Sequence, residues 1–551
     1  MPKTSTQNKR QKLISKGAAI DAINFRKQTL LHIAVKNGHL GFCQLLISNG
    51  AAIDAINSEK ETPLHIAVEN GHLGICLLLI SKGAAIDAID FQKQTPLHIA
   101  VKNGHLGICQ LLISKGAAID AINSWKNTPL HIAVTTENLD ICQLLISNGA
   151  AIDAINSAKE TPLHIAVENG HLGICLLLIS KGAAIDAINF QKETPLHIAV
   201  TTENLDICQL LISNGAAIDA INSEKETPLH IAVENGHLGI CLLLISKGAA
   251  IDAINFQKQT PLHIAVENGH LFICVLLISK GAEIDNRSSW IETPLHIAVT
   301  IGNLGICQLL ISKGAAIDAI DSWKETLLHI AVANGNLDIC QLLISKGAAI
   351  DVINFWKQTP LHIAVKNGHL GICQLLISKG AKIDTIDFSY KTPLHDAAFS
   401  GELKACQLLI SNGATIDALD SSKSTPLHLA AQYGHLNVCR LLVSKGASIN
   451  SLNSYNVTPL MLASFSFYPH TLKSICRDII NKKALYIHKC NNIRHIPNKL
   501  KNYLTYTDEL ISLEQEKRKS KGSPRSLYII LKYDELARKA SALKTIFYSN
   551  E

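Results

Sequence analysis

The chain repeats one pattern of apolar and polar residues every 33 positions. The tetrapeptide TPLH, or a close variant, begins at 14 threonines from Thr29 to Thr458 without a single insertion. In the copy at residues 227–259, the apolar runs LHIAV (229–233) and LGICLLLIS (238–246) each have the length of a short helix. Thr followed by Pro is typical of an N-cap and a first helical position, and glycine follows both runs. The remaining segment, 249–259, predicts a hairpin-like connection, called a finger below.

Helices this short are marginal alone, so each unit is expected to bury its apolar face on its neighbours. The period and the TPLH signature resemble the ankyrin repeat. The resemblance covers residues 14–469 and implies an all-α solenoid of helix–turn–helix units with β-hairpin-like fingers. It also implies a long concave face that binds a target protein. One departure is the finger tip, where the family usually has glycine and this chain mostly has lysine, as at Lys60 and Lys225. We expect a less relaxed tip there.

Composition and charge limit the environment and the partners. The chain has 551 residues, 47% hydrophobic and 17% charged, as expected of a folded protein. Its N-terminus is polar and basic, and its longest apolar runs are far below the roughly 20 residues of a membrane span. This predicts a cytoplasmic or nuclear location. The net charge is +6, but residues 17–469 carry 29 Lys or Arg against 37 Asp or Glu. A basic stripe for nucleic acid is therefore not expected.

Cysteine and histidine follow the repeat instead of forming sites. Thirteen of the 15 cysteines recur in the second predicted helix, which indicates a buried small-residue position and a reducing compartment. Thirteen histidines belong to TPLH and are expected to satisfy hydroxyl and backbone groups in the turn. No pair has zinc-site spacing and no catalytic set interrupts the period. We expect no metal, no cofactor and no enzyme activity. The acids of the recurring IDAI are interpreted as solubilising.

The four tryptophans share one finger position. The same position holds Gln, Glu, Ala, Ser, Arg or Tyr in other units while its surroundings hardly change, so the fold does not require it. Exposed aromatic residues aligned on one edge favour contact with a partner, although each ring could instead fold onto the adjacent finger. The predicted target-binding residues are Trp125, Trp290, Trp323, Trp356 and the neighbouring Tyr390. The irregular units from 392 onward, such as HDAAFSGELKAC, offer further distinctive surface.

The repeat ends at Pro469, and a different pattern follows. In TLKSICRDII, Leu472, Cys476 and Ile480 form one stripe of a helix that Thr471 can cap. Downstream, Pro497 can open a second helix with an apolar side. Such stripes suit the groove of a partner, and they equally suit a helix pair that caps the solenoid.

This helix pair, within residues 470–506, resembles a SOCS box. In that family the first element binds elongin C and the second favours a cullin scaffold. Arg494 and His495 depart from the Leu-Pro expected in the second element. The elongin-binding residues implied by the resemblance are Thr471, Leu472, Cys476 and Ile480. The implied cullin-binding residues are Ile496, Pro497, Leu500, Tyr503 and Leu504.

The two resemblances together imply a non-catalytic substrate-recognition subunit of a cullin–RING ubiquitin ligase, with elongin B/C as its adaptor. Two alternatives stay open. One is an ankyrin scaffold without a ligase role, and the other is an ankyrin protein with an F-box-like adaptor module. Residues 1–13 are predicted to be a basic tail, and 507–551 a basic linker with a C-terminal helix.

Overall fold

The computed structural model describes residues 20–465 of the chain. The chain divides into two compact units, Met1–Ser289 (unit 1) and Trp290–Glu551 (unit 2). Within the described residues every regular element is a helix, and one isolated antiparallel bridge joins Ile320 to Thr326. The predicted all-α class and the helix–turn–helix repeats are therefore confirmed. The predicted modules at 470–506 and 507–551, and the tail at 1–13, lie outside the described residues.

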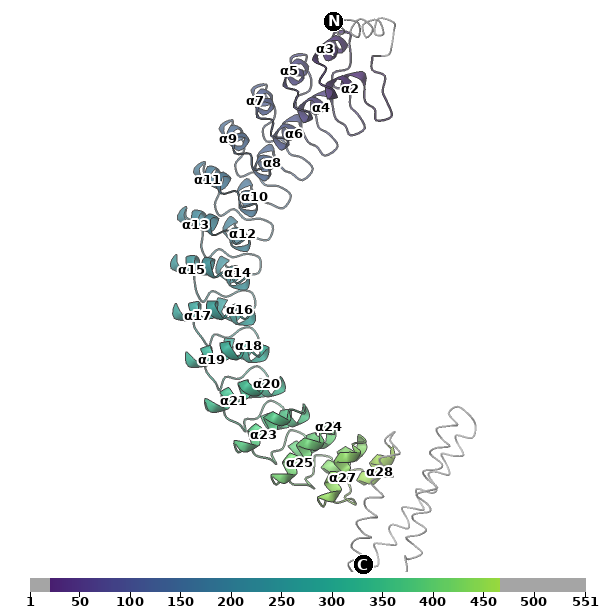
Figure 1. The fold of residues 1–551 in the computed structure, drawn as a ribbon, viewed down its shortest axis with the longest axis vertical. Coiled ribbons are helices and arrows are strands. Elements are labelled where there is room, and N and C mark those ends of the chain that lie inside the picture. The colour runs from purple at the N-terminus through teal and green to yellow at the C-terminus, as the bar shows by residue number, and fades with distance from the viewer. Residues whose placement is uncertain (1–19, 466–551) are drawn as a thin grey trace, which may run out of the picture. The chain divides into compact units, whose positions relative to one another are not determined.

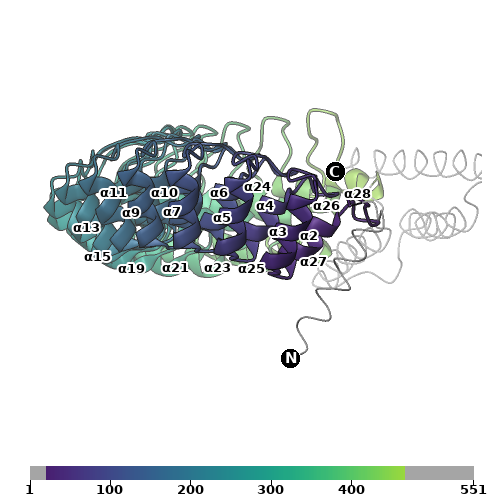
Figure 2. The same cartoon turned by 90° about the horizontal axis from the view of Figure 1, so that it is seen from above.

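Unit 1 consists of paired helices, one pair for each repeat. The even-numbered helices form one row and the odd-numbered helices form a second row, and the fingers project from the even-numbered row (Figure 1). Seen from above, the connecting loops of this unit gather along one edge (Figure 2). The helices are α2 (Leu30–Lys36), α3 (Leu40–Ser48), α4 (Pro63–Glu69), α5 (Leu73–Ser81), α6 (Pro96–Lys102), α7 (Leu106–Ser114), α8 (Pro129–Thr135), α9 (Leu139–Ser147), α10 (Pro162–Glu168), α11 (Leu172–Ser180), α12 (Pro195–Thr201), α13 (Leu205–Ser213), α14 (Pro228–Glu234), α15 (Leu238–Ser246), α16 (Pro261–Glu267) and α17 (Leu271–Ser279).

Unit 2 repeats the same pairing. Its helices are α18 (Pro294–Ile301), α19 (Leu304–Ser312), α20 (Leu327–Ala333), α21 (Leu337–Ser345), α22 (Pro360–Lys366), α23 (Leu370–Ser378), α24 (Pro393–Ser400), α25 (Leu403–Ser411), α26 (Pro426–Gln432), α27 (Leu436–Ser444) and α28 (Pro459–Phe465).

Each first helix from α2 to α26 begins with a capping box in which histidine replaces the usual acid, whereas α28 has Met461 at this position. In α14, the Oγ1 of Thr227 accepts the backbone N–H of His230 at 3.5 Å. The ring Nδ1 of His230 accepts the backbone N–H of Thr227 at 3.2 Å. Two N–H groups that a helix start leaves without partners are thus satisfied by a reciprocal pair. The prediction that this histidine serves the turn is confirmed, and it is called the cap histidine below.

The cap histidine also joins neighbouring repeats. The Nε2 of His230 lies 3.2 Å from the carbonyl oxygen of Gln259, which precedes the next capping threonine. Because Nδ1 already accepts the threonine N–H, Nε2 carries the proton and donates to that carbonyl. His230 is fully buried, and burial lowers its pKa although the Gln259 carbonyl raises it. The same bond is made by eleven of the cap histidines, and each of these rings is a neutral link between successive repeats of one unit.

The core is a stack of apolar layers along each unit. In α14, Leu229, Ala232 and Val233 are fully buried, and in α15 Cys241 and Leu244 are fully buried. The small alanine and cysteine positions allow first and second helices to approach closely, and neighbouring repeats contribute equivalent layers. Within residues 20–465 none of the helices has both the length and the apolar character needed to cross a membrane.

Candidate interaction surface on the fingers

The finger turn is built by the backbone and one amide or carboxylate side chain. In the finger before α14, the Oδ1 of Asn222 accepts the N–H groups of Glu224 and Glu226, both at 2.9 Å. The N–H of Lys225 donates to the carbonyl of Asn222 at 3.1 Å. Lys225 adopts a left-handed conformation, with φ +59°, which favours glycine. The expectation of a less relaxed backbone at the finger tip is confirmed, because in most fingers a lysine occupies this left-handed conformation.

Backbone hydrogen bonds connect successive fingers within a unit. The N–H of Ser223 donates to the carbonyl of Gln191 in the preceding finger at 2.9 Å, and Phe256 donates likewise to Glu224. The same bond recurs in unit 2, where Phe355 donates to Trp323 at 3.0 Å. The contact between fingers therefore uses the backbone carbonyl of the variable finger position, whichever side chain that position carries.

The IDAI acids have a structural role that the sequence interpretation missed. The Oδ1 of Asp219 accepts the N–H of Ala250, which lies one repeat further along the chain, at 2.9 Å. These bonds lie at the surface, and each gives a backbone N–H an acceptor in the preceding repeat, so the carboxylates join repeat to repeat. The interpretation of these acids as solubilising stays a prediction, and the structure adds the contact between repeats. The same contact is made by Asp21, Asp54, Asp87, Asp120, Asp153, Asp186, Asp219, Asp252, Asp351, Asp384 and Asp417.

Side chains at the variable finger position remain exposed. In unit 2 the exposed fraction is 71% for Trp290, 56% for Trp323 and 44% for Trp356, and Trp125 in unit 1 is 51% exposed. Tyr390 is 58% exposed and occupies the left-handed tip, with φ +59°, where most fingers have lysine. These fractions are high for such large apolar side chains, which normally bury most of their surface.

The structure brings two of the predicted tryptophans together. The rings of Trp323 and Trp356 are stacked, with centroids 5.6 Å apart and planes inclined by 14°. Phe355 meets Trp356 edge to face, with centroids 6.0 Å apart. Trp125 belongs to unit 1, apart in sequence from this group. Thus Trp323 and Trp356 partly cover one another and still present about half of their surface to solvent.

A second aromatic finger position was only partly recognised in the sequence. It holds either serine or phenylalanine, and in three fingers the lysine of the preceding finger lies over the phenylalanine ring. The Nζ of Lys225 lies 5.9 Å from the ring centroid of Phe256, and that of Lys357 lies 5.7 Å from Phe388. This distance is within the range of a cation–π interaction. The signal in the sequence was the recurrence of phenylalanine at this fixed place in the finger, directly after Asn or Asp.

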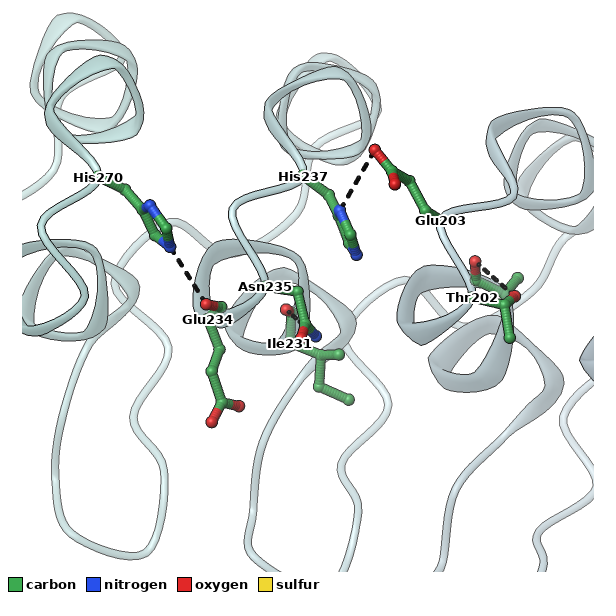
Figure 3. Close-up of polar contacts among 8 residues, drawn as sticks. Thr202, Glu203, Ile231, Glu234, Asn235, His237 and His270 are labelled. Atoms are coloured by element: carbon green, nitrogen blue, oxygen red, sulfur yellow. Dashed lines mark hydrogen bonds and ion pairs between the residues drawn. The ribbon is translucent and has the colours of Figure 1, made fainter.

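Histidines in the turn between paired helices also join repeats, in two alternative ways. His270 Nε2 lies 3.2 Å from the carbonyl of Glu234, and its ring stands where a Cβ at Gly236 would intrude, 2.9 Å away (Figure 3). Where Glu203 replaces that glycine, the Nδ1 of His237 instead faces the Glu203 carboxylate at 3.4 Å (Figure 3). In the described part of the chain, no three His, Cys, Asp or Glu side chains are grouped to hold a metal ion.

The cysteines of the described repeats are buried and unreactive. All 13 cysteines of the repeats are free thiols with no exposed surface, and burial raises the pKa of Cys241 to about 12. A thiol with such a pKa is almost entirely protonated at neutral pH, and the protonated form is a poor nucleophile. The predicted small-residue role of these cysteines in the second helix is confirmed.

One acid departs from the apolar pattern of the inner helices. Asp396 in α24 occupies the position that holds Ile363 in α22 and Leu429 in α26, and only 6% of it is exposed. Its Oδ2 has no hydrogen-bond partner. Burial, and then the charge of Asp387, raises the pKa of Asp396 to about 7, against the opposing effect of Lys391 and Lys366. The irregular stretch HDAAFSGELKAC thus contains a buried acid that the fold does not need.

The stacked helix pairs and exposed fingers define a repeat protein that offers side chains for protein contact and uses its polar core residues to join repeats. A family model described as ankyrin repeats in three copies matches residues 7–90, 82–156, 152–222, 204–288, 285–354, 349–420 and 394–484. Among curated proteins, none matches the chain. The chain belongs to the ankyrin-repeat family, whose members are generally non-catalytic scaffolds for protein–protein interaction.

The remaining predicted site residues lie outside the described residues. They are the elongin-binding residues Thr471, Leu472, Cys476 and Ile480, and the cullin-binding residues Ile496, Pro497, Leu500, Tyr503 and Leu504. The ankyrin match that begins at residue 394 extends to 484 and so includes the first of these groups.

Proposed function

We propose that the chain is a substrate-recognition subunit of a cullin–RING ubiquitin ligase. It binds a target protein through the fingers of the ankyrin array and elongin B/C through residues 470–506. Its contribution is to hold target lysines near a charged ubiquitin carrier, which raises their effective concentration without chemistry of its own.

The observation that carries the target-binding half is the exposed tryptophan stack. The N–H of Trp323 donates to Asp321 Oδ1 at 2.8 Å and its carbonyl accepts from Phe355, so Trp323 takes part in the finger through its backbone groups. The indole rings of Trp323 and Trp356 add little to that turn and keep about half of their surface in water. Tryptophan in such positions is characteristic of binding hot spots.

The ligase half rests on the sequence after the array. The order of an elongin-type stripe, from Thr471 to Ile480, and a cullin-type segment, from 496 to 504, supports it. The second candidate is an ankyrin scaffold whose stripe completes the last repeat. The extension of the ankyrin match to residue 484 favours this alternative.

The ligase half is tested by affinity purification of the wild-type chain beside Leu472→Asp/Cys476→Asp. A Lys473→Asp/Arg477→Asp variant adds the same two carboxylates beside the stripe and serves as the matched control. Elongin B/C present with the wild type and the control, and lost only with the stripe variant, supports the proposal. Elongin B/C absent from all three leaves the scaffold, and a different adaptor lost with the stripe indicates an F-box-like module.

The target half is tested by alanine at Trp290, Trp323 and Trp356 together. The matched control replaces the same finger position in unit 1, with Gln191→Ala, Glu224→Ala and Gln257→Ala. Proteins retained by the wild type and the control should be lost from the tryptophan variant, because hot-spot rings each contribute about 2 kcal/mol or more. Unchanged affinity for every partner rejects these residues as the target site, and Trp125→Ala is assayed separately.

A further inference from the structure

The exposed charges beside the tryptophan stack are mainly positive. Lys324 and Lys357 are exposed at the left-handed finger tips that follow Trp323 and Trp356. Lys357 Nζ lies over the ring of Phe388, and Lys391 Nζ lies 5.5 Å from the ring centroid of Phe399. These ammonium groups therefore rest on aromatic faces, where they remain available to an anion.

The acids of the same fingers already accept hydrogen bonds. Asp321 Oδ1 accepts the N–H groups of Trp323 and Glu325, both at 2.8 Å. Asp387 Oδ1 accepts the N–H groups of Ser389 and Lys391, both at 2.8 Å. The carboxylate of Glu325 accepts the side-chain amide of Asn354 at 3.1 Å. These half-buried carboxylates are used by the turns, so lysine and aromatic rings dominate what this surface offers a partner.

The fingers of unit 1 offer a different surface. Two of them, at the position of the tryptophans, present the exposed carboxylates of Glu59 and Glu224 directly beside the tip lysines Lys60 and Lys225, and only Trp125 is a tryptophan there. An acid and a lysine are thus adjacent in the sequence of these two fingers. Their opposite charges offset one another, so a charged partner gains little binding energy from either. The backbone turn is the same in both units, and the difference lies in the side chains.

We propose that the unit 2 fingers bind an acidic protein segment that carries aromatic or aliphatic side chains. This inference deepens the proposed function, since it names the chemical class of the target for the same fingers. Apolar side chains of the segment cover the Trp323–Trp356 stack, and its carboxylates meet Lys324, Lys357 and Lys391. Single-stranded RNA, which also stacks on aromatic rings, is disfavoured because these three lysines form a short cluster and not the continuous basic groove that follows a phosphate chain.

The test selects peptides from a phage-displayed library of random sequences on the full-length chain. Selected sequences are synthesised with a fluorophore, and their binding is measured by fluorescence anisotropy at low and high salt. We expect sequences rich in Asp or Glu with at least one Trp, Phe, Tyr or Leu, and affinities that fall as salt rises. An oligouridylate probe is measured in parallel.

Replacing lysine by glutamate shows which of the two units provides the lysines that bind the peptide. Lys324→Glu/Lys357→Glu should weaken peptide binding on the order of tenfold, whereas Lys192→Glu/Lys225→Glu in unit 1 should leave it within about twofold. All four positions have the same left-handed backbone, which Glu137 and Glu203 also adopt in this chain, so the fold is retained. Restoring the lost affinity with peptides in which Lys replaces the acids would confirm direct pairing.

Several results would overturn the inference. These are no selected peptides, basic or neutral peptides, an equal loss in both pairs of variants, and tighter binding of oligouridylate than of any peptide. The proposed function fails separately, through the purification experiments with the stripe and tryptophan variants. Loss of targets from the tryptophan variant without acidic peptides would therefore refute only the acidic class.

Discussion

The start of the first helix and the tip of the finger make opposite use of their side chains. At the helix start, Thr227 and His230 are both buried, and their side chains form hydrogen bonds within the cap and with the next repeat. At the finger tip, Asn222 and the backbone complete the turn, and Glu224 projects into solvent. The same 33-residue unit thus contains a region in which the fold dictates the residue and a region in which it does not. Recognition can change at the second without cost to the first.

Lowering the pH should produce the largest difference between these regions. Burial lowers the pKa of eleven cap histidines below the ordinary value of 6.5, so the unfolded chain binds protons that the folded chain does not. Stability is therefore full above about pH 6.5 and falls as the pH drops below it, by as much as about 1 kcal/mol for each histidine between pH 7 and 5.5. Urea unfolding followed by circular dichroism across this range measures the loss. A flat profile between pH 7 and 5 would contradict the buried neutral state.

Replacing one cap histidine should disturb its own repeat strongly. His230→Ala removes the capping box and leaves the Gln259 carbonyl without its donor, and we expect a loss of about 3 kcal/mol. Glu224→Ala, in the finger of the same repeat, should change stability by less than about 0.5 kcal/mol. Amide hydrogen exchange of α14 and α15, measured by mass spectrometry, reports both. Equal effects of the two variants would remove the distinction between the regions.

Asp396 is an exception within the buried region, and removing it should stabilise the chain. Because its folded pKa is raised to about 7, ionisation above that pH costs free energy that the unfolded chain does not incur. Asp396→Ile, which copies Ile363 of the preceding repeat, should raise stability by about 2 kcal/mol at pH 8 and by less at pH 5. The comparison of thermal unfolding at the two pH values is the measurement. A loss of stability at pH 8 would show that the acid has a partner in the fold.

The smallest expected effect concerns the finger turn itself. Ile291 adopts φ +66°, a conformation that is strained for a β-branched residue. Ile291→Gly should raise stability by about 1 kcal/mol. Lys258→Gly, at the equivalent tip of unit 1 with φ +56°, should gain less because lysine is not branched at Cβ. A destabilised Ile291→Gly variant would mean that this side chain contributes to packing.

The helices and the caps could be predicted from the sequence because they depend on neighbours a few residues apart. Thr-Pro and Gly identify the helix ends, and the spacing of Cys241 within its apolar run indicates a buried position. The bond from His230 to Gln259 and that from Ala250 to Asp219 could not be predicted, because each joins residues that only stacking brings together.

The candidate surface was predicted in part. The shared position of the tryptophans and its variation between fingers pointed to exposure, and the exposed fractions of Trp323 and Trp356 agree with it. Their stacking and the lysine contacts of the phenylalanines depend on side-chain rotamers, which no pattern determines. The irregular run that contains Asp396 was visible, but its burial without a partner follows only from its place between Ile363 and Leu429.

The most direct test of the account combines folding and binding in one comparison within unit 2. The variant with alanine at Trp290, Trp323 and Trp356 is measured beside His329→Ala, whose ring lies 3.0 Å from the Gln358 carbonyl. We predict that the tryptophan variant loses its bound proteins while hydrogen exchange in α20–α23 stays close to that of the wild type. Fast exchange like that of His329→Ala, together with an unchanged set of bound proteins, would contradict it.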